Sequence, residues 1–334
     1  MARMIHRRTA IARAIAGAVL AAPMHVRHGW AGDSYPTSKT RRIVVPFAAG
    51  GTADCLGRVI AQILAESTSS SFVIENRTGA GGNVSAEIVA KAAPDGRTLL
   101  LGTLGTAVTN QYLYKYVPYD SEWSFTPIAL VGEVTNVIVV HPTFPASTLK
   151  EFVDYCKGQG PDKVSYGSPA VGGAGHLSME YLQGHAGIKL RHVAYDSRSR
   201  MIKDLLAGHI PIAMDNLPPY LRHIQSGVLR ALGVSSAGRW FAAPDVPSIS
   251  EQGYPGFEAA LWWYVAAPAG MRLDLVKKLS DEIVKGIRSD TAIKRIRESG
   301  ASELPGNTED LARHIVTERI KWKRVIDAAK LEPQ

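Results

Sequence analysis

Three glycine-rich segments of the chain each follow a short apolar run and precede a pattern typical of a helix. They are residues 48–54 (AAGGTAD), 76–83 (NRTGAGGN) and 167–176 (GSPAVGGAGH). A glycine turn between a strand and a helix directs backbone N–H groups and the helix N-terminus at one point beyond the sheet, which favours an anion. Ligands of open α/β sheets bind beyond the carboxyl ends of the strands. We therefore expect all three turns near a ligand; the alternative for each is a tight turn that only needs positive φ.

The residues near these turns also contain the types needed for catalysis. Ser168, His176 and Asp215 are the types of a hydrolase triad, but no G-x-S-x-G elbow is present. A metal site is conceivable at His176, Glu180 and His185, which lie on or near one predicted helix. Neither the H-E-x-x-H motif nor a pair of closely spaced cysteines supports it. The nucleotide motifs G-x-G-x-x-G with a downstream acid and G-x-x-x-x-G-K-[ST] are both absent. We predict a protein that is not an enzyme and that holds no metal or cofactor.

Short apolar runs alternate with helical patterns along the chain, which predicts α/β domains with parallel sheets covered on both faces by helices. The expected strands are 42–47, 72–75, 98–101, 137–141, 164–167, 189–193, 210–214, 229–234 and 262–267. The expected helices are 54–66, 83–91, 149–157, 175–183, 199–207, 219–226, 273–288, 291–299 and 308–330.

The N-terminus predicts export. Residues 1–8 carry three Arg and no acid, an apolar run follows over 10–23, and Gly29-Trp30-Ala31 offers small residues for cleavage. We expect residues 1–31 to be a signal peptide and the mature protein to be periplasmic. A twin-arginine signal at Arg7-Arg8 and a retained basic helix are the alternatives. The apolar run is too short for a stable membrane span.

Charge and cysteine content exclude other classes. Five Arg and no acid lie in residues 1–31, so most of the net charge of +8 belongs to the predicted signal peptide. The remaining basic residues are mixed with acids, which argues against nucleic-acid binding. The two cysteines, Cys55 and Cys156, lie in separate predicted helices, and we expect two free thiols.

Several ordered segments resemble the receptors of tripartite tricarboxylate transporters, also called the Bug family of periplasmic solute-binding proteins. These segments are Tyr35-Pro36 before RIVVPFAAGGTAD, ENRTGAGG from Glu75, APDGRTLL from Ala93, Tyr166 to His176, LLAG from Leu205, Met214-Asp215-Asn216, and PDVPS from Pro244. The resemblance covers nearly all of the chain after residue 31.

The resemblance implies two Rossmann-like α/β domains joined by a hinge, a type II periplasmic-binding-protein (Venus flytrap) fold that closes on its ligand. Domain 1 would comprise residues 32–136 plus 258–334, and domain 2 would comprise residues 137–257. A small carboxylate, such as a di- or tricarboxylate, an amino acid or an aromatic acid, would bind between them.

In the family, backbone amides of the glycine loops hold a ligand carboxylate. Carried onto this chain, the resemblance places these ligand-binding residues in the first domain: Phe47, Ala48, Ala49, Gly50, Gly51 and Asp54. In the second domain it places Ser168, Gly173, His176 and Asp215. Thr103 and Thr106, after the third strand, are further candidates for hydroxyl contacts. For Asp54 and His176 the alternative is a role at the start of a helix, bonded to the local backbone.

One segment departs from the family pattern. Where the family has Pro-Tyr-Lys-Gly and small residues, this chain has Ala194-Tyr195-Asp196-Ser197-Arg198-Ser199-Arg200. Arg198 and Arg200 could supply guanidinium donors in place of amides, since a guanidinium binds a carboxylate at two points. We therefore expect either a preference for a di- or polycarboxylate or a loss of ligand binding; the alternative is that both arginines face solvent.

The sequence leaves the biological partner open. The resemblance implies delivery of the ligand to the membrane permease subunits of a tripartite transporter. A sensor-kinase ectodomain that recognises the loaded receptor is the alternative, and a hydrolase using Ser168 and His176 is a third. We expect a monomer.

Overall fold

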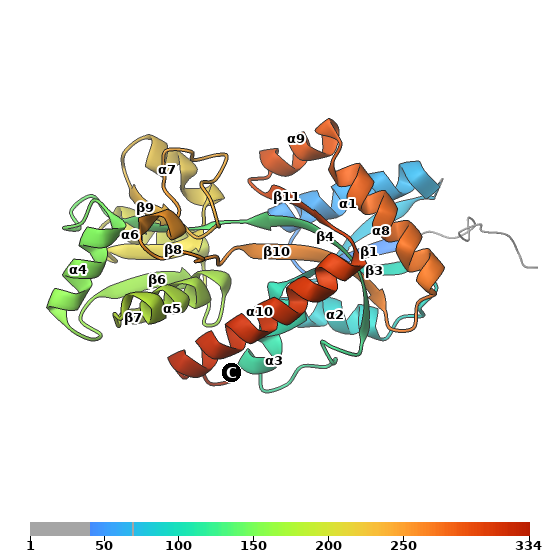
Figure 1. Ribbon diagram of the computed structural model, residues 1–334, viewed down its shortest axis with the longest axis horizontal. Coiled ribbons are helices and arrows are strands. Elements are labelled where there is room, and N and C mark those ends of the chain that lie inside the picture. The colour runs from blue at the N-terminus through green and yellow to red at the C-terminus, as the bar shows by residue number, and fades with distance from the viewer. Residues whose placement is uncertain (1–40, 69) are drawn as a thin grey trace, which may run out of the picture. The chain divides into compact units, whose positions relative to one another are not determined.

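The computed structural model describes residues 41–68 and 70–334, and within them two mixed β-sheets, each flanked by helices (Figure 1). The predicted signal peptide, residues 1–31, lies outside the described residues. No helix in the described ranges combines the length and apolar character needed to cross a membrane.

The first lobe is built on a six-stranded sheet with the strand order β11-β4-β10-β3-β1-β2. Its strands are β1 (Arg41–Val45), β2 (Phe72–Asn76), β3 (Thr98–Thr103), β4 (Phe125–Val134), β10 (Leu261–Pro268) and β11 (Ser302–Gly306). Its helices are α1 (Thr52–Thr68), α2 (Asn83–Ala90), α3 (Asn110–Leu113), α8 (Leu273–Ile287), α9 (Asp290–Glu298) and α10 (Thr308–Ala329), with short turns η1 (Ala80–Gly82) and η2 (Gly105–Thr109).

The second lobe is built on a five-stranded sheet with the order β7-β6-β8-β5-β9. Its strands are β5 (Asn136–Val140), β6 (Ser165–Pro169), β7 (Arg191–Tyr195), β8 (Ile212–Asn216) and β9 (Arg230–Val234). Its helices are α4 (Leu149–Gln159), α5 (Ala174–Ala186), α6 (Arg198–Leu206) and α7 (Leu221–Gln225), with short turns η3 (Pro218–Tyr220) and η4 (Ser250–Gln252).

Alternating side chains of each strand supply two separate cores. In β1, Ile43 and Val45 pack with α1, α8 and α9 on one face, while Val44 packs toward α2 and α10 on the other. In β5, Val137 packs with α6 on one face, and Ile138 packs with α4 and α5 on the other. Both sheets are therefore buried on two faces, as the apolar runs predict.

The chain passes between the lobes at two places, which are tied together by buried polar groups. The side chain of Asn136, at the start of β5, donates through Nδ2 to Ser178 Oγ and to the Ala259 carbonyl oxygen, both at 2.9 Å. Ser235 exchanges bonds with the same strand, because its N–H donates to the Asn136 carbonyl oxygen and its Oγ accepts from the Asn136 N–H. Removing these bonds would leave polar groups buried without partners, which is costly.

The prediction of parallel sheets was wrong, because both observed sheets are mixed. Strand β10 runs antiparallel to β3 and β4, and β5 runs antiparallel to β8 and β9. The reason lies in the connection between the lobes. Parallel neighbours are joined by a crossover, usually a helix, but β4 continues directly into β5, so β5 runs antiparallel to its neighbours in the second sheet. Strands β4 and β11 were absent from the prediction. The domain boundaries near residues 136 and 257 stay a prediction.

The expectation of two free thiols is confirmed. Cys55 lies in α1 and is partly buried, while Cys156 lies in α4 and is buried. Burial raises the pKa of the Cys156 thiol to about 12, so this residue remains a neutral apolar group at physiological pH.

Candidate functional site

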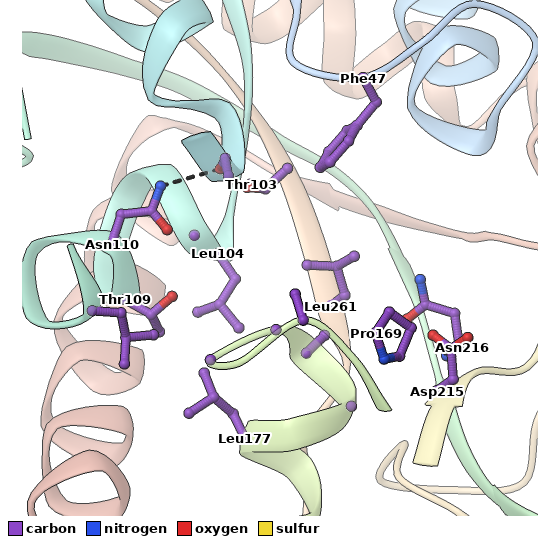
Figure 2. A pocket seen from close by; sticks show the side chains of 18 of the residues that line it. Phe47, Thr103, Leu104, Thr109, Asn110, Pro169, Leu177, Asp215, Asn216 and Leu261 are labelled. Atoms are coloured by element: carbon purple, nitrogen blue, oxygen red, sulfur yellow. Dashed lines mark hydrogen bonds between the residues drawn. The ribbon is translucent and has the colours of Figure 1, made fainter. Parts of the chain in front are cut away.

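A cavity of about 390 Å³ is lined by residues from both lobes. Figure 2 shows side chains from both lobes around it, among them Phe47, Thr103 and Asp215. This volume is within the range of small-molecule sites. Each of the three glycine turns contributes to the wall, through Gly51, Gly81 and the segment 169–175. The polar or aromatic side chains of the wall include Thr52, Thr103, Thr109, Asn110, Tyr114, Arg198, Asp215, Asn216, Trp263 and Gln334.

In the first lobe, the start of α1 lies at the cavity, with Thr52 and Ala53 in the wall. The first N–H groups of an α-helix have no partner within the helix, and the helix dipole places partial positive charge there. Asp54 stabilises the turn before the helix, because its Oδ2 accepts from the Gly50 N–H at 3.0 Å and from Arg58 Nε at 2.9 Å. Burial would raise the pKa of Asp54, but the hydrogen bonds from Arg58, Gly50 and Asn76 outweigh it and lower the pKa.

In the second lobe, the loop before α5 forms the facing part of the wall. Gly172 has φ +71°, a left-handed conformation that glycine adopts without strain, and its N–H donates to His176 Nδ1 at 2.9 Å. An added Cβ on Gly175 would lie 2.0 Å from the Met214 carbonyl oxygen, so only glycine allows α5 to start this close to β8. The N-terminus of α5 is therefore held at the cavity by two glycines and one histidine.

Behind this loop lies a cluster of three buried residues, Tyr166, Ser168 and His176, and two partly buried ones, Glu180 and His192. The two histidine rings stack with centroids 3.8 Å apart, and Ser168 Oγ lies 2.8 Å from His192 Nε2. Tyr166 Oη donates to Glu180 at 3.0 Å. Burial, followed by the neighbouring His176, lowers the pKa of His192 to about 4.

This cluster does not form the Ser168–His176 pair of the hydrolase alternative. The hydrogen-bond partner of Ser168 is His192, and the Ser168 side chain is fully buried. His176 Nδ1 is occupied by a backbone N–H, and Nε2 faces Glu180 at 3.6 Å. No group of three or more His, Cys, Asp or Glu side chains in residues 41–68 and 70–334 is arranged to hold a metal ion.

The lowered pKa of His192 predicts sensitivity to acid. Between about pH 6.5 and 4 the unfolded chain binds a proton at this residue while the folded chain does not, so stability falls as the pH falls through this window. We expect His192→Gln, which cannot titrate but still offers Ser168 a hydrogen bond, to reduce the loss of unfolding free energy between pH 7 and 4.5 by about 1–3 kcal/mol.

Denaturant unfolding at the two pH values measures this difference. His209→Gln is the control, because His209 is exposed on the surface beside Asp204. An equal pH dependence in wild type and His192→Gln would contradict the prediction.

The only Asp, Glu, Lys or Arg side chains in the described wall of the cavity are Arg198 and Asp215. Arg198 Nε donates to Asp215 Oδ2 at 2.6 Å, and Nη2 donates to Oδ1 at 3.1 Å. Burial would lower the pKa of Arg198, but the hydrogen bonds and charge of Asp215 raise it. Arg198 thus lies in the cavity wall, whereas Arg200 is exposed and outside it, and a ligand contact of Arg198 stays a prediction.

The structure brings together some of the predicted ligand-binding residues and not others. Those in the cavity wall are Phe47, Gly51, Thr103, Gly173, Arg198 and Asp215. Those outside it are Ala48, Ala49, Gly50, Asp54, Thr106, Ser168 and His176.

Ser168 bonds His192, and the other residues outside the wall fall into two groups. Ala48, Ala49 and Gly50 are exposed on the same loop. Asp54 and His176 bond the local backbone, which is the alternative given for them above, and Thr106 Oγ1 accepts from the Thr103 N–H at 2.9 Å.

Sequence reasoning missed several wall residues. Asn110 Nδ2 donates to the Gly81 carbonyl oxygen at 3.1 Å, which ties the second glycine turn to η2 and α3 (Figure 2). Tyr114, Asn216 and Trp263 of β10 also contribute to the wall. Asn216 had a sequence signal, since it follows Asp215 at the carboxyl end of a predicted strand. Trp263 had one too, because alternate residues of the strand that begins at Trp262 face opposite ways, so that one of its two tryptophans could line the cleft; packing of both is the alternative.

Comparisons with known proteins agree with this architecture. Residues 56–331 match the model of the tripartite tricarboxylate transporter family receptor. Among solved structures, R. palustris Rpa4515 with adipate has 35% sequence identity and a TM-score of 0.76, covering 89% of this chain and 99% of that chain.

Two further structures are similar over the same range. The periplasmic binding protein BugD has 32% identity and a TM-score of 0.72, covering 89% of this chain and 99% of that chain. MatC from Rhodopseudomonas palustris with bound malate has 28% identity and a TM-score of 0.71, covering 86% of this chain and 98% of that chain. The type II periplasmic-binding-protein fold with two α/β domains is thereby confirmed. This chain belongs to the tripartite tricarboxylate transporter receptor family, a family of extracytoplasmic solute-binding proteins.

Proposed function

We propose that the chain captures a small carboxylate in the cavity between its two lobes and delivers it to the membrane permease subunits of a tripartite transporter. The observation that carries this proposal is the pair of helix N-termini, of α1 and α5, that line one cavity from opposite lobes. Each presents backbone N–H groups and partial positive charge, which stabilise an anion without a buried lysine. Adipate and malate, the ligands of the two related structures, are both dicarboxylates.

Two polar atoms of wall residues, Asn216 Oδ1 and Trp263 Nε1, are buried and have no hydrogen-bond partner among the described residues. The indole N–H is a donor and would suit a carboxylate oxygen, whereas the amide oxygen is an acceptor and would suit a ligand hydroxyl or water. Catalysis is not part of the proposal, because Ser168 and His176 support the loop and do not line the cavity.

We propose residues 32–136 with 258–334, and residues 137–257, as the two domains that close on the ligand. Residues 1–31 would direct export to the periplasm. Expression of the full chain and of a chain lacking residues 1–31, followed by cell fractionation, tests this: retention of both in the cytoplasm would contradict it.

A thermal-shift screen tests the proposed function. Purified ligand-free protein is heated with monocarboxylates, linear and hydroxy dicarboxylates, tricarboxylates, amino acids and aromatic acids. A ligand that binds only the folded state stabilises it by about 2.7 kcal/mol at a hundredfold excess over its Kd. We expect a rise in Tm with carboxylates and none with their methyl esters. Folded protein whose Tm does not respond to any carboxylate would overturn the proposal.

A further inference from the structure

The Arg198–Asp215 pair is a feature of the cavity that the two helix N-termini do not explain. Arg198 is the first residue of α6, after Ser197, whose Oγ accepts from the Arg200 N–H. Asp215 lies near the end of β8. The Asp215 side chain is only 3% exposed, whereas that of Arg198 is 43% exposed. The pair is therefore asymmetric, with its acid buried and its guanidinium partly open.

The hydrogen bonds of Asp215 are already complete. Besides the two bonds from Arg198, Asp215 Oδ1 accepts from the Asn216 N–H at 2.8 Å, and Oδ2 accepts from Tyr220 Oη at 3.3 Å. Four donors therefore fix the carboxylate in place without any ligand. Its charge is matched by Arg198, so the acid is unavailable to a cationic group of a ligand while the pair is intact.

The guanidinium of Arg198, in contrast, has N–H donors that Asp215 does not bind. Arginine has five N–H donors, of which Asp215 takes the Nε–H and one on Nη2. The second edge, formed by Nη1 and the other N–H of Nη2, has no partner among residues 41–68 and 70–334. A guanidinium edge of this kind binds a carboxylate with two parallel hydrogen bonds. Asp215 thus orients Arg198 and leaves the Nη1–Nη2 edge free to bind a carboxylate with two hydrogen bonds.

We infer that Arg198 determines ligand specificity: its free edge binds the second carboxylate of a linear dicarboxylate whose first carboxylate lies at the helix N-termini, and it shields Asp215 from cationic ligands. The inference rests on the proposed function and deepens it by naming the substrate class. It predicts that the group at the far end of the ligand, rather than its carbon chain, decides the affinity.

Three ligands of equal length separate these effects. Adipate, hexanoate and 6-aminohexanoate share a six-carbon chain and one carboxylate, and end in a negative, an apolar and a positive group. Succinate, butyrate and 4-aminobutyrate repeat the comparison with four carbons. Isothermal titration calorimetry measures Kd for each with wild type, Arg198→Ala, Arg198→Lys and the double variant Arg198→Ala/Asp215→Asn.

For wild type we expect the dicarboxylate of at least one length to bind best and the amino acid worst. Arg198→Ala should weaken the dicarboxylate by about 10- to 100-fold, the range expected for a lost charge-assisted hydrogen-bond pair, and leave the monocarboxylate unchanged. The same variant should bind the amino acid more tightly than wild type, because Asp215 is then exposed to its ammonium group. The double variant should lose that gain, and Arg198→Lys should restore only part of the dicarboxylate affinity.

Arg200→Ala is the matched control, because Arg200 lies in the same helix but is exposed and outside the cavity wall. Circular dichroism and Tm establish that each variant is folded; if Arg198→Ala does not fold, Arg198→Lys and the wild-type ligand series carry the test. Equal wild-type affinity for dicarboxylate and monocarboxylate, or an unchanged dicarboxylate affinity in Arg198→Ala, would overturn this inference alone. Failure of folded wild type to bind any carboxylate would overturn the proposed function with it.

Discussion

Replacement of Gly175 by alanine is expected to lower the affinity for a carboxylate at least tenfold and to destabilise the fold by about 3 kcal/mol, as in an overpacked core. The added Cβ would lie 2.0 Å from the carbonyl oxygen and 2.9 Å from the carbonyl carbon of Met214. Both atoms belong to the backbone of β8, so no side-chain rotation relieves the contact. Helix α5 must move away from β8, and the loop at Gly172 and Gly173 moves with it, away from Asp215.

Gly184→Ala is the control for this prediction. Gly184 lies in the same helix, and a Cβ there would meet nothing within 4 Å. Because alanine favours a helix over glycine by about 1 kcal/mol, this variant should be slightly more stable and should bind normally. Denaturant unfolding and calorimetric titration of both variants measure the two effects. A Gly175→Ala protein that binds and unfolds like wild type would show that α5 and β8 are not held at this distance.

Replacement of Glu318 by alanine is expected to destabilise the protein by about 3 kcal/mol or more, because it leaves buried donors without an acceptor. Glu318 lies in α10 and is buried. Its Oε2 accepts from Trp262 Nε1 at 3.0 Å and from Trp322 Nε1 at 2.8 Å, and Lys321 lies beside its Oε1. One carboxylate thus joins the strand β10, which enters the first lobe, to the helix that covers it.

Two further variants make this prediction specific. Glu318→Gln keeps an acceptor for the indole groups and should lose less stability than Glu318→Ala. Asp327→Ala removes the exposed partner of Lys323 in the same helix and should change stability little, since exposed ion pairs contribute little. Thermal and denaturant unfolding rank the three variants. Equal stability of Glu318→Ala and Asp327→Ala would refute the role given to this carboxylate.

The strands and helices with a regular pattern could be predicted from the sequence. The periodic apolar residues of α1 and the continuous apolar run of β1 require only local information. Strand β4 could not be predicted in this way, because Pro127 and Gly132 interrupt its apolar run. Its pairing with β10 shows register shifts between Trp263 and Tyr264 and between Val265 and Ala266, and such irregular ladders accommodate these residue types.

The candidate site was predictable at its glycine turns but not at its side chains. A glycine turn that follows a strand and precedes a helix lies at the carboxyl end of that strand. All three turns could therefore be assigned to the strand ends where ligands of α/β sheets bind. The pairing of Arg198 with Asp215 joins residues from two elements, and no local pattern encodes it. The same applies to His192, which takes the hydrogen bond of Ser168 from a neighbouring strand. Contacts of this kind depend on how the strands are ordered in the sheet.

The strand order also has a consequence for when each sheet can be completed during folding. The five strands of the second sheet lie between residues 136 and 234, so this sheet can be completed from one continuous stretch of chain. In the first sheet, β10 lies between β4 and β3, and β11 pairs with β4, although both strands are near the end of the chain. Until residues 261–268 are available, β3 and β4 have unpaired edges, which are prone to association with other chains. We therefore expect the first sheet to form last, because a chain cut short before β10 lacks the strand that joins β3 to β4.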